Sequence, residues 1–255
     1  MALMAITRAV SASLAQCELT HLSREPLDVR LAERQHAAYE DALARLGATL
    51  IRAEAAPELP DAVFIEDTAV VLPELAIVTR PGAASRRGET AAVRSALMPY
   101  RTVAELEAPA TLDGGDVLRL GHTLYVGAST RSNEAGIDAL ARLVEPHGYS
   151  VVVVAFSGCL HLQSAATAIG ENAVVLNPAW VSDQAFGRVE VVVVDPDEPY
   201  AANVLLLRRR AIHGAEYPKT RVRLEAYGLD VTPVACSELA KAEGAVTCCS
   251  LVFEE

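Results

Sequence analysis

A repeated unit is the feature that most constrains what this chain can fold into. Helix-like segments ended by glycine or proline are followed by a strand-like segment, a turn and a second apolar segment that opens with a polar residue. These polar residues recur at intervals of 47, 48, 42 and 45: they are Glu66, Asp113, His161, Asn203 and Cys248. Repeats of this length are typical of solenoids, propellers and closed rings. A ring of five such units would bring the five polar residues to one central axis.

The periodicity of apolar residues predicts the elements of these units. Helices are expected from Asp28 to Leu46, where Gly47 ends the helix, from a cap at Ser85 to about Met98, over about 133–144, and over about 219–227. Strands are expected at 6–9, 49–53, 63–71, 75–79, 102–106, 124–126, 150–155, 173–176, 189–194, 204–207 and 230–234. No linker or low-complexity stretch interrupts the series, so we expect one domain over residues 1–255.

The last unit ends in an apolar run from Gly244 to Phe253, which its Val, Thr, Cys and Phe content predicts to be a buried strand. Successive strand side chains point to opposite faces, so only one of Cys248 and Cys249 is expected to face a given pocket. For an isolated cysteine pair, two small core residues would be the simpler interpretation. The place of Cys248 in the repeat favours a functional role.

Composition narrows the class of protein. Hydrophobic residues make up 51% and charged residues 22% of the 255 residues, which predicts a soluble globular chain. The net charge of −11 argues against nucleic acid and anionic membranes as partners and is compatible with a small cationic ligand. Five widely spaced cysteines give no disulfide framework, no zinc motif occurs, and no apolar run could span a bilayer. We therefore expect a cytoplasmic protein with no metal site.

Several sequence blocks resemble the dimethylarginine dimethylaminohydrolase family of the guanidine-modifying (pentein) superfamily. They run in order over nearly the whole chain: Glu33–His36, Leu59–Asp67, Thr79–Arg87, Leu112–Asp116, Leu160–Leu162, Ala201–Asn203, Glu216–Pro218 and Thr247–Ser250. The resemblance implies an α/β fold, a five-fold pseudo-symmetric propeller of ββαβ-type modules around a central site. It also implies hydrolysis of asymmetric dimethylarginine and monomethylarginine to citrulline and dimethylamine or methylamine, without a metal or organic cofactor. A small-molecule substrate is thus expected, and a homodimer is left open.

The resemblance also implies the catalytic residues. Cys248 corresponds to the nucleophile, since a thiolate is the side chain best suited to attack the poorly electrophilic guanidinium carbon. His161 corresponds to the general acid and base that protonates the departing amine and then activates water. Asp113 corresponds to the acid that orients this imidazole. Taken alone, the Asp113–Asp116 segment also fits a simple turn.

The same likeness implies how substrate would be held. Glu66 and Asp67 correspond to the acids that bind the guanidinium nitrogens. Arg86 and Arg131 correspond to residues that bind the α-carboxylate, and Asp61 to the partner of the α-amino group. The backbone at Leu19 and Ala242 would close over the ligand, with the segment before Asp28 acting as a lid.

Two positions depart from the family pattern and bear on the alternatives. Gln163 stands where the family often has Lys and where deiminases have Asp, which argues against a deiminase, although arginine or another guanidine remains an alternative substrate. Glu243 stands where the family usually has Asp before Gly244, and its role is open. A third alternative is a protein that binds a guanidino compound without turning it over.

Overall fold

Five three-stranded sheets form the framework of the computed structural model, which describes residues 1–255. In each sheet the middle strand pairs antiparallel with an inner strand and parallel with an outer strand. In the order inner, middle, outer, the sheets are β3 (Ala69–Val71), β4 (Leu75–Val78) and β5 (Thr102–Glu105); β6 (Val117–Leu120), β7 (Thr123–Gly127) and β8 (Ser150–Val154); β9 (Ala166–Gly170), β10 (Ala173–Leu176) and β11 (Glu190–Val193); β12 (Val204–Leu207), β13 (Arg210–Gly214) and β14 (Asp230–Val234); and β15 (Leu251–Glu254), β1 (Leu3–Thr7) and β2 (Ala48–Arg52).

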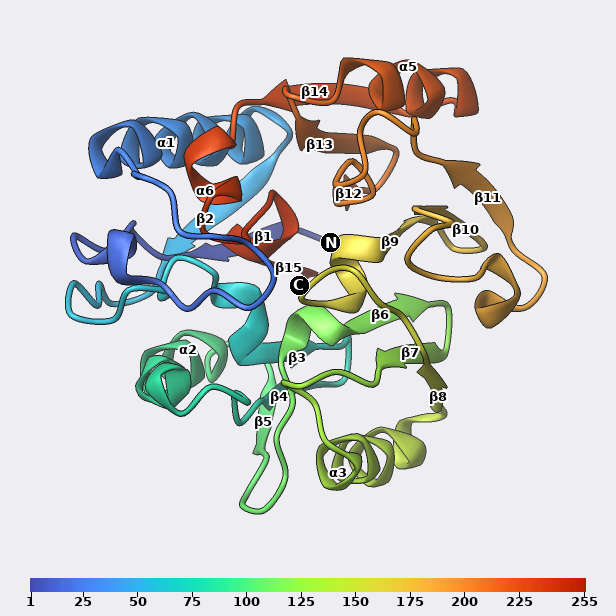
Figure 1. The fold of residues 1–255 in the computed structure, drawn as a ribbon. Helices are drawn as coiled ribbons and strands as arrows, with labels where there is room; N and C mark the ends of the chain where they lie inside the picture. Colours follow the sequence, from blue (N-terminus) through green and yellow to red (C-terminus); the bar gives the residue numbers. More distant parts are fainter.

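A helix connects the middle strand to the outer strand in four of the five modules, as a parallel connection requires. These helices are α1 (Val29–Arg45), α2 (Thr90–Leu97), α3 (Glu134–Val144) and α5 (Pro218–Tyr227), and they lie on the outside of the ring (Figure 1). The module of β9, β10 and β11 has only the short 3₁₀ turn η6 (Asp183–Phe186) in this place. The predicted ring of five ββαβ-type modules is confirmed.

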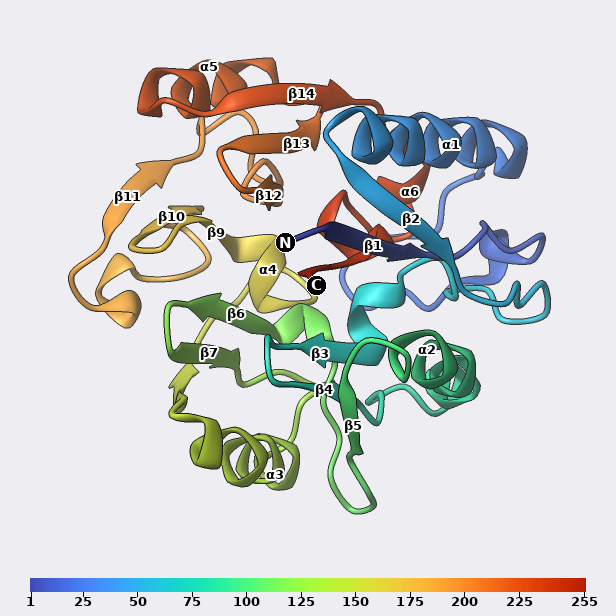
Figure 2. The same cartoon turned by 180° about the vertical axis from the view of Figure 1, so that it is seen from behind.

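The ring is closed by pairing between the two ends of the chain. Strand β1 pairs with β15 on one side and with β2 on the other, so the fifth sheet contains both the first and the last strand. Both views place the chain ends near the centre of the ring (Figures 1 and 2). Closure leaves the inner strands facing a common axis, which is where the repeated polar residues were expected.

Short helical turns precede the inner strands, which corrects two predicted strands. They are η2 (Ile65–Thr68), η4 (Gly114–Asp116), α4 (Leu162–Ala165) and η7 (Thr247–Cys249). The predicted strands at 63–71 and 244–253 are therefore reduced to Ala69–Val71 and Leu251–Glu254. Side chains of neighbouring modules take up N–H groups that a strand would have directed to a ladder. Gly115 N donates to Asp67 Oδ1, Leu162 N to Asp116 Oδ1, and Thr247 N to Asn203 Oδ1.

Most other predicted elements are confirmed within a few residues. The side chains of Asp28 and Asn133 cap α1 and α3 by accepting hydrogen bonds from Leu31 N and Gly136 N. Ser85 is not a cap, because the 3₁₀ turn η3 (Ala84–Glu89) precedes α2. The strand expected to open at His161 is β9, which begins only at Ala166 because α4 stands between them, and β13 was missed. The remaining elements are η1 (Leu14–Gln16), η5 (Glu145–His147) and α6 (Ser237–Ala240).

Buried apolar residues form five separate clusters rather than one central core. The largest contains 21 residues, joins α1 to the last module, and includes Cys248 and Cys249. The centre of the ring is thereby left to polar side chains. No helix combines the length and apolar character needed to cross a membrane.

Candidate active site

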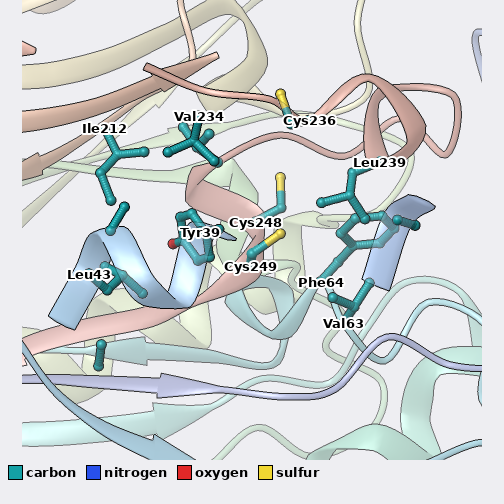
Figure 3. Close-up of a cluster of buried hydrophobic side chains, with 14 of the residues drawn as sticks. Tyr39, Leu43, Val63, Phe64, Ile212, Val234, Cys236, Leu239, Cys248 and Cys249 are labelled. Carbon is teal, nitrogen blue, oxygen red and sulfur yellow. The ribbon is translucent and has the colours of Figure 1, made fainter. Parts of the chain in front are cut away.

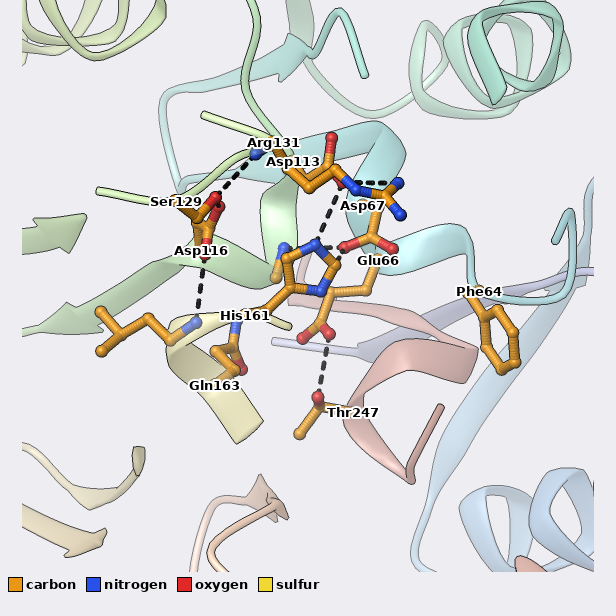
Figure 4. Close-up of polar contacts among 12 residues, drawn as sticks. Phe64, Glu66, Asp67, Asp113, Asp116, Ser129, Arg131, His161, Gln163 and Thr247 are labelled. Atoms are coloured by element: carbon orange, nitrogen blue, oxygen red, sulfur yellow. Dashed lines mark hydrogen bonds and ion pairs between the residues drawn. The ribbon is translucent and has the colours of Figure 1, made fainter. Parts of the chain in front are cut away.

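Three polar residues of the repeat, Glu66, Asp113 and His161, meet near the ring axis on or beside the turns that precede the inner strands (Figure 4). Cys248 lines the same cavity as His161. His161 is the N-cap residue of α4 and Asp113 that of η4, while Glu66 lies on η2 and Cys248 on η7. Each comes from a different module and each is buried. One imidazole, several carboxylates and one thiol are therefore presented by a rigid ring rather than by a flexible loop.

His161 lies between two carboxylates. Its Nε2 is 3.0 Å from Asp113 Oδ2, a hydrogen bond that the imidazole N–H donates, and its Nδ1 is 3.6 Å from Asp67 Oδ1. Burial alone would lower the pKa of His161, but the charges of Asp67, Asp113 and Asp116 outweigh it and raise the pKa to about 10. The imidazole therefore carries a proton at neutral pH, as a general acid must before it donates.

A second layer of contacts fixes this arrangement. Asp116 accepts hydrogen bonds from Ser129 Oγ, Ser132 Oγ and Leu162 N, which anchors the backbone beside His161. Gly115 is required by space: a Cβ there would lie 2.7 Å from Asp67 Oδ1 and 2.9 Å from His161 Nδ1. The Gly114-Gly115 pair therefore both forms the turn and admits the imidazole.

Glu66 connects the acids to the thiol. Its Oε2 accepts a hydrogen bond of 2.9 Å from Thr247 Oγ1, which also accepts one from Asn203 Nδ2. Burial and the nearby charge of Asp67 raise the pKa of Glu66 to about 8, although hydrogen bonds from Thr247 and Cys248 oppose this rise. A cation placed beside Glu66 would relieve both causes and favour its ionised form.

Asp67 is held by Arg86, which belongs to a buried chain of charges. Arg86 Nη1 is 2.5 Å from Asp67 Oδ2, and its Nε and Nη2 donate to the two carboxylate oxygens of Glu89 at 3.1 and 2.9 Å. Arg86 Nη2 also donates to the backbone oxygens of Phe64 and Asp61. The structure thus shows Arg86 organising acids, and its predicted contact with a substrate carboxylate stays a prediction. Glu89 was missed, because only its i,i+3 spacing from Arg86 signals the pair.

The two cysteines lie on η7 and belong to the largest apolar cluster (Figure 3). The predicted separation of their side chains comes from the turn and not from strand alternation. Cys248 lines a cavity with His161, whereas Cys249 Sγ lies 3.5 Å from Ala245 O and is fully enclosed. Burial, together with Glu66 and Asp67, raises the pKa of the Cys248 thiol well above its ordinary value. In the empty cavity this sulfur is therefore a neutral thiol.

The cavity is small, with a volume of about 10 Å³, and it is covered by the segment that precedes α1. Its lining holds most of the predicted residues and several missed ones: Glu18, Asp61, Phe64, Asp67, Arg86, Arg131, Leu160, His161, Ala242, Glu243, Gly244 and Cys248. Phe64 and Gly244 were missed because they act as a pair, in which a Cβ on Gly244 would lie 2.0 Å from the Phe64 ring. Glu66 and Asp113 lie behind this lining.

The residues predicted to hold the amino acid end of a substrate contact the covering segment instead. Asp61 Oδ2 accepts a hydrogen bond from Glu18 N, and Arg131 Nη2 donates to Thr20 Oγ1. Leu19 lies between these two contacts and packs partly buried against the largest apolar cluster. Substrate would have to take over these contacts, so binding and movement of the covering segment are coupled.

Three of these groups also have the spacing of metal ligands. Donor atoms of Asp67, Asp113 and His161 lie within 4.8 Å of one another. A protonated imidazole has no free lone pair, however, and both ring nitrogens of His161 face carboxylates. The two aspartates instead flank a protonated imidazole, which leaves no nitrogen lone pair for a metal ion.

Known proteins with the same sequence pattern identify the family. The model of the eukaryotic N,N dimethylarginine dimethylhydrolase family matches residues 21–195. The N(G),N(G)-dimethylarginine dimethylaminohydrolase of Streptomyces coelicolor is 41% identical over 98% of this chain and 97% of its own length. Its counterpart from Pseudomonas aeruginosa is 34% identical over 92% of both chains.

Solved structures of related proteins superpose closely on this chain. A cysteine-to-serine mutant of the Pseudomonas aeruginosa enzyme, complexed with citrulline, superposes with a TM-score of 0.94 at 33% identity, covering 99% of this chain and all of that one. The N-terminal domain of the arginine dihydrolase ArgZ superposes with a TM-score of 0.88 at 19% identity, covering 100% and 98% of the two chains, which shows a shared fold. The ring, the buried imidazole between acids and these likenesses lead to one conclusion: the chain belongs to the dimethylarginine dimethylaminohydrolase family.

Proposed function

We propose that this chain hydrolyses asymmetric dimethylarginine and monomethylarginine to L-citrulline and dimethylamine or methylamine. The observation that carries the proposal is the buried grouping of Cys248, His161 and Asp67 in one cavity, with Asp113 hydrogen-bonded to the protonated imidazole from behind. The family supports the same conclusion, since its Pseudomonas aeruginosa member has been solved with citrulline. Gln163 donates its amide to Val117 O and supplies no carboxylate for an unsubstituted guanidinium, which disfavours a deiminase.

The positive charge of the substrate would favour ionisation of the Cys248 thiol. Glu66 and Asp67 would receive the guanidinium nitrogens, which places the central carbon beside the sulfur of Cys248. A cation at this position lowers the pKa of the adjacent thiol, which the surrounding acids and burial raise, and the thiol proton passes to solvent as substrate binds. The nucleophile is therefore formed where and when a guanidinium is present.

The first step makes a covalent adduct. A bond forms between Cys248 Sγ and the guanidinium carbon, and the bond from this carbon to the methylated nitrogen then breaks. His161 gives its proton to the departing amine, so the amine leaves as a neutral molecule. Asp113 stabilises the imidazolium beforehand and fixes the ring through Nε2. The product of this step is a thiouronium on Cys248.

The second step releases citrulline. The imidazole, now neutral, takes a proton from a water molecule as the oxygen attacks the thiouronium carbon. The carbon–sulfur bond breaks, the second proton of the water passes to the departing sulfur, and neutral citrulline leaves. Cys248 is again a neutral thiol and His161 is again protonated. The imidazole thus gives one proton to the amine and recovers one from water, while its two nitrogens face carboxylates.

The amino acid end of the substrate would lie toward the covering segment. Arg131 is proposed to bind the α-carboxylate together with Arg86, and Asp61 to bind the α-amino group, with the backbone at Leu19 and Ala242 closing the site. The partner is thus a small cationic amino acid, and the net charge of −11 disfavours nucleic acid and anionic membranes. A cytoplasmic location fits five cysteines that all remain free thiols, and a homodimer is left open by the sequence.

Citrulline release by the purified protein tests this function. Asymmetric dimethylarginine and monomethylarginine should each yield citrulline with an equal amount of the matching amine. Arginine, offered at the same concentration, should yield far less. Citrulline formed from arginine as fast as from the methylated forms would contradict the proposal in favour of a deiminase, and tight binding without citrulline would favour a binding protein.

A further inference from the structure

Glu243 is one of the two residues that depart from the family pattern, and its carboxylate lies against the segment that covers the cavity. We call residues 18–27, between η1 and the cap of α1, the lid segment. Glu243 accepts hydrogen bonds from three consecutive backbone N–H groups of this segment: Thr20 N at 3.0 and 3.1 Å, His21 N at 2.5 Å, and Leu22 N at 2.6 Å. Consecutive N–H groups that converge on one point form a site for an anion.

The backbone at Glu243 adopts an unfavourable conformation that accompanies this contact. Its φ is +59°, in the left-handed region that side chains other than glycine and asparagine rarely occupy. Such conformations cost on the order of 1 kcal/mol and are retained where the surrounding structure needs them. The turn that follows α6 directs the carboxylate toward the lid segment, while Ala242 and Gly244 on either side remain in the cavity lining.

Besides Glu243, several residues contact the lid segment, which has no helix or strand of its own. These hydrogen bonds are Glu18 N to Asp61, Arg131 to Thr20 Oγ1, Ser85 Oγ to Glu18, Arg24 to the backbone oxygens of Ala15 and Cys17, and Lys241 Nζ to Pro26 O. Two of these use residues that substrate would engage, so they weaken when substrate binds. The Glu243 contact uses no such residue and can persist.

We propose that Glu243 is a latch that holds the lid segment over the reaction cavity, and that it does so independently of the substrate-binding residues. It is a positioning residue, since it acts through the backbone of Thr20, His21 and Leu22 and not on the reacting atoms. Beside this contact lies a neighbouring cavity of about 310 Å³, whose lining includes His21, Leu22, Glu243 and Gly244. Release of the latch would therefore open a path from the site to solvent past Leu160, which lines both cavities.

Hydrogen exchange of the lid segment in the substrate-free protein tests the latch without any reference to catalysis. Glu243→Gln keeps the shape of the side chain but loses the charge, and we expect the amides of residues 20–22 to exchange roughly tenfold faster, as the loss of about one charge-assisted hydrogen bond implies. Glu243→Gly removes the carboxylate, and glycine accepts a φ of +59° without strain, so the ring should stay folded. Its lid amides should exchange fastest.

Glu25→Gln is the matched control. Glu25 lies in the lid segment and is exposed, and its side chain takes part in no hydrogen bond, so this variant makes the same change of charge without touching the latch. It should exchange like the wild type. Equal exchange in wild type, Glu243→Gln and Glu243→Gly, with unchanged melting temperatures, would overturn the proposal, as would a Glu25→Gln variant that behaves like Glu243→Gln.

The kinetic consequence rests on the proposed function and is measured separately. With dimethylarginine as substrate, Glu243→Gln should raise KM by roughly tenfold and lower kcat by much less, because the chemistry at Cys248 is untouched. Equal loss in kcat with unchanged KM would contradict a latch. If no methylated arginine is turned over by the wild type, the exchange experiment still decides whether Glu243 holds the lid segment.

Discussion

The two sides of the reaction cavity differ in how completely their charges are arranged before substrate arrives. On the His161 side, Asp67, Asp113 and Asp116 set the proton on the imidazole, and Arg86 and Glu89 hold Asp67 in turn. On the Cys248 side, the thiol belongs to an apolar cluster, and its nearest charges are acids that oppose ionisation. The proposed general acid, His161, therefore carries its proton before substrate binds (the ready side), whereas the proposed nucleophile, Cys248, is not yet ionised (the unready side). In such a site, we expect the thiolate to form only when a cation occupies the cavity.

The largest expected effect tests which of the two cysteines is the nucleophile on the unready side. Cys248→Ser should lower turnover by more than about 10⁴-fold while binding of dimethylarginine persists, because the serine hydroxyl is not ionised by a neighbouring cation. Cys249→Ser is the matched control and should keep most of the rate, since its sulfur faces Ala245 O and not the cavity. Turnover and binding by calorimetry measure the two effects, and an inactive Cys249→Ser variant with an active Cys248→Ser variant would reverse the assignment.

The next effect concerns the ready side. His161→Ala should lower turnover by about 10² to 10⁴-fold, the range of a general acid, with a smaller change in affinity. Asp113→Asn should give a smaller loss, because Asp67 remains on the other ring nitrogen. Rapid-mixing measurements of amine and citrulline release separate the two chemical steps. If both variants lost affinity instead of rate, the network would serve binding and the contrast between the two sides would fail.

The smallest expected effect is on stability as a function of pH. The pKa of His161 is about 10 in the folded protein against an ordinary 6.5, so the folded state holds a proton that the unfolded state has lost between these values. The stability that this proton contributes is fully present below pH 6.5 and is lost as pH rises toward 10. Glu66, with a pKa of about 8 against 4.5, acts with the same sign between pH 4.5 and 8.

Melting temperatures therefore should fall from pH 6.5 to pH 9.5. The fall should be shallower in His161→Gln, which has no proton to lose. Glu25→Gln, a change of an exposed side chain that takes part in no hydrogen bond, is the control and should follow the wild type. A wild type whose melting temperature rises over this range would contradict the charge assignment of the ready side.

Much of the ring was predictable because the same order of helix-like and strand-like apolar patterns recurs along the sequence. The positions of Glu66, Asp113, His161 and Cys248 at equivalent places in their modules followed from spacing. The turns that carry them did not, since Val63–Val71 and Gly244–Phe253 have the composition of strands. There, hydrogen bonds from side chains of other modules decide the local structure, and a single segment carries no trace of such partners.

The site was predictable where residues stand in known blocks and not where they act in pairs across the ring. Gly115 makes room for an imidazole that lies 46 positions further along, and Glu89 neutralises an arginine that was expected to bind a ligand. Glu243 was visible as a departure from the pattern, but its partner is the backbone of residues 20–22, which no side chain reveals. A contact to the main chain leaves no pattern of residue types in the sequence.

The shared sheet of the first and last strands has a consequence for how the site is assembled. Cys248 lies three residues ahead of β15, and β15 pairs with β1, whose other partner is β2. The other four modules can bring their acids to the axis without this pairing, but Cys248 is held there only when β1 and β15 are joined. The grouping of Cys248 with His161 and Asp67 therefore requires a closed ring.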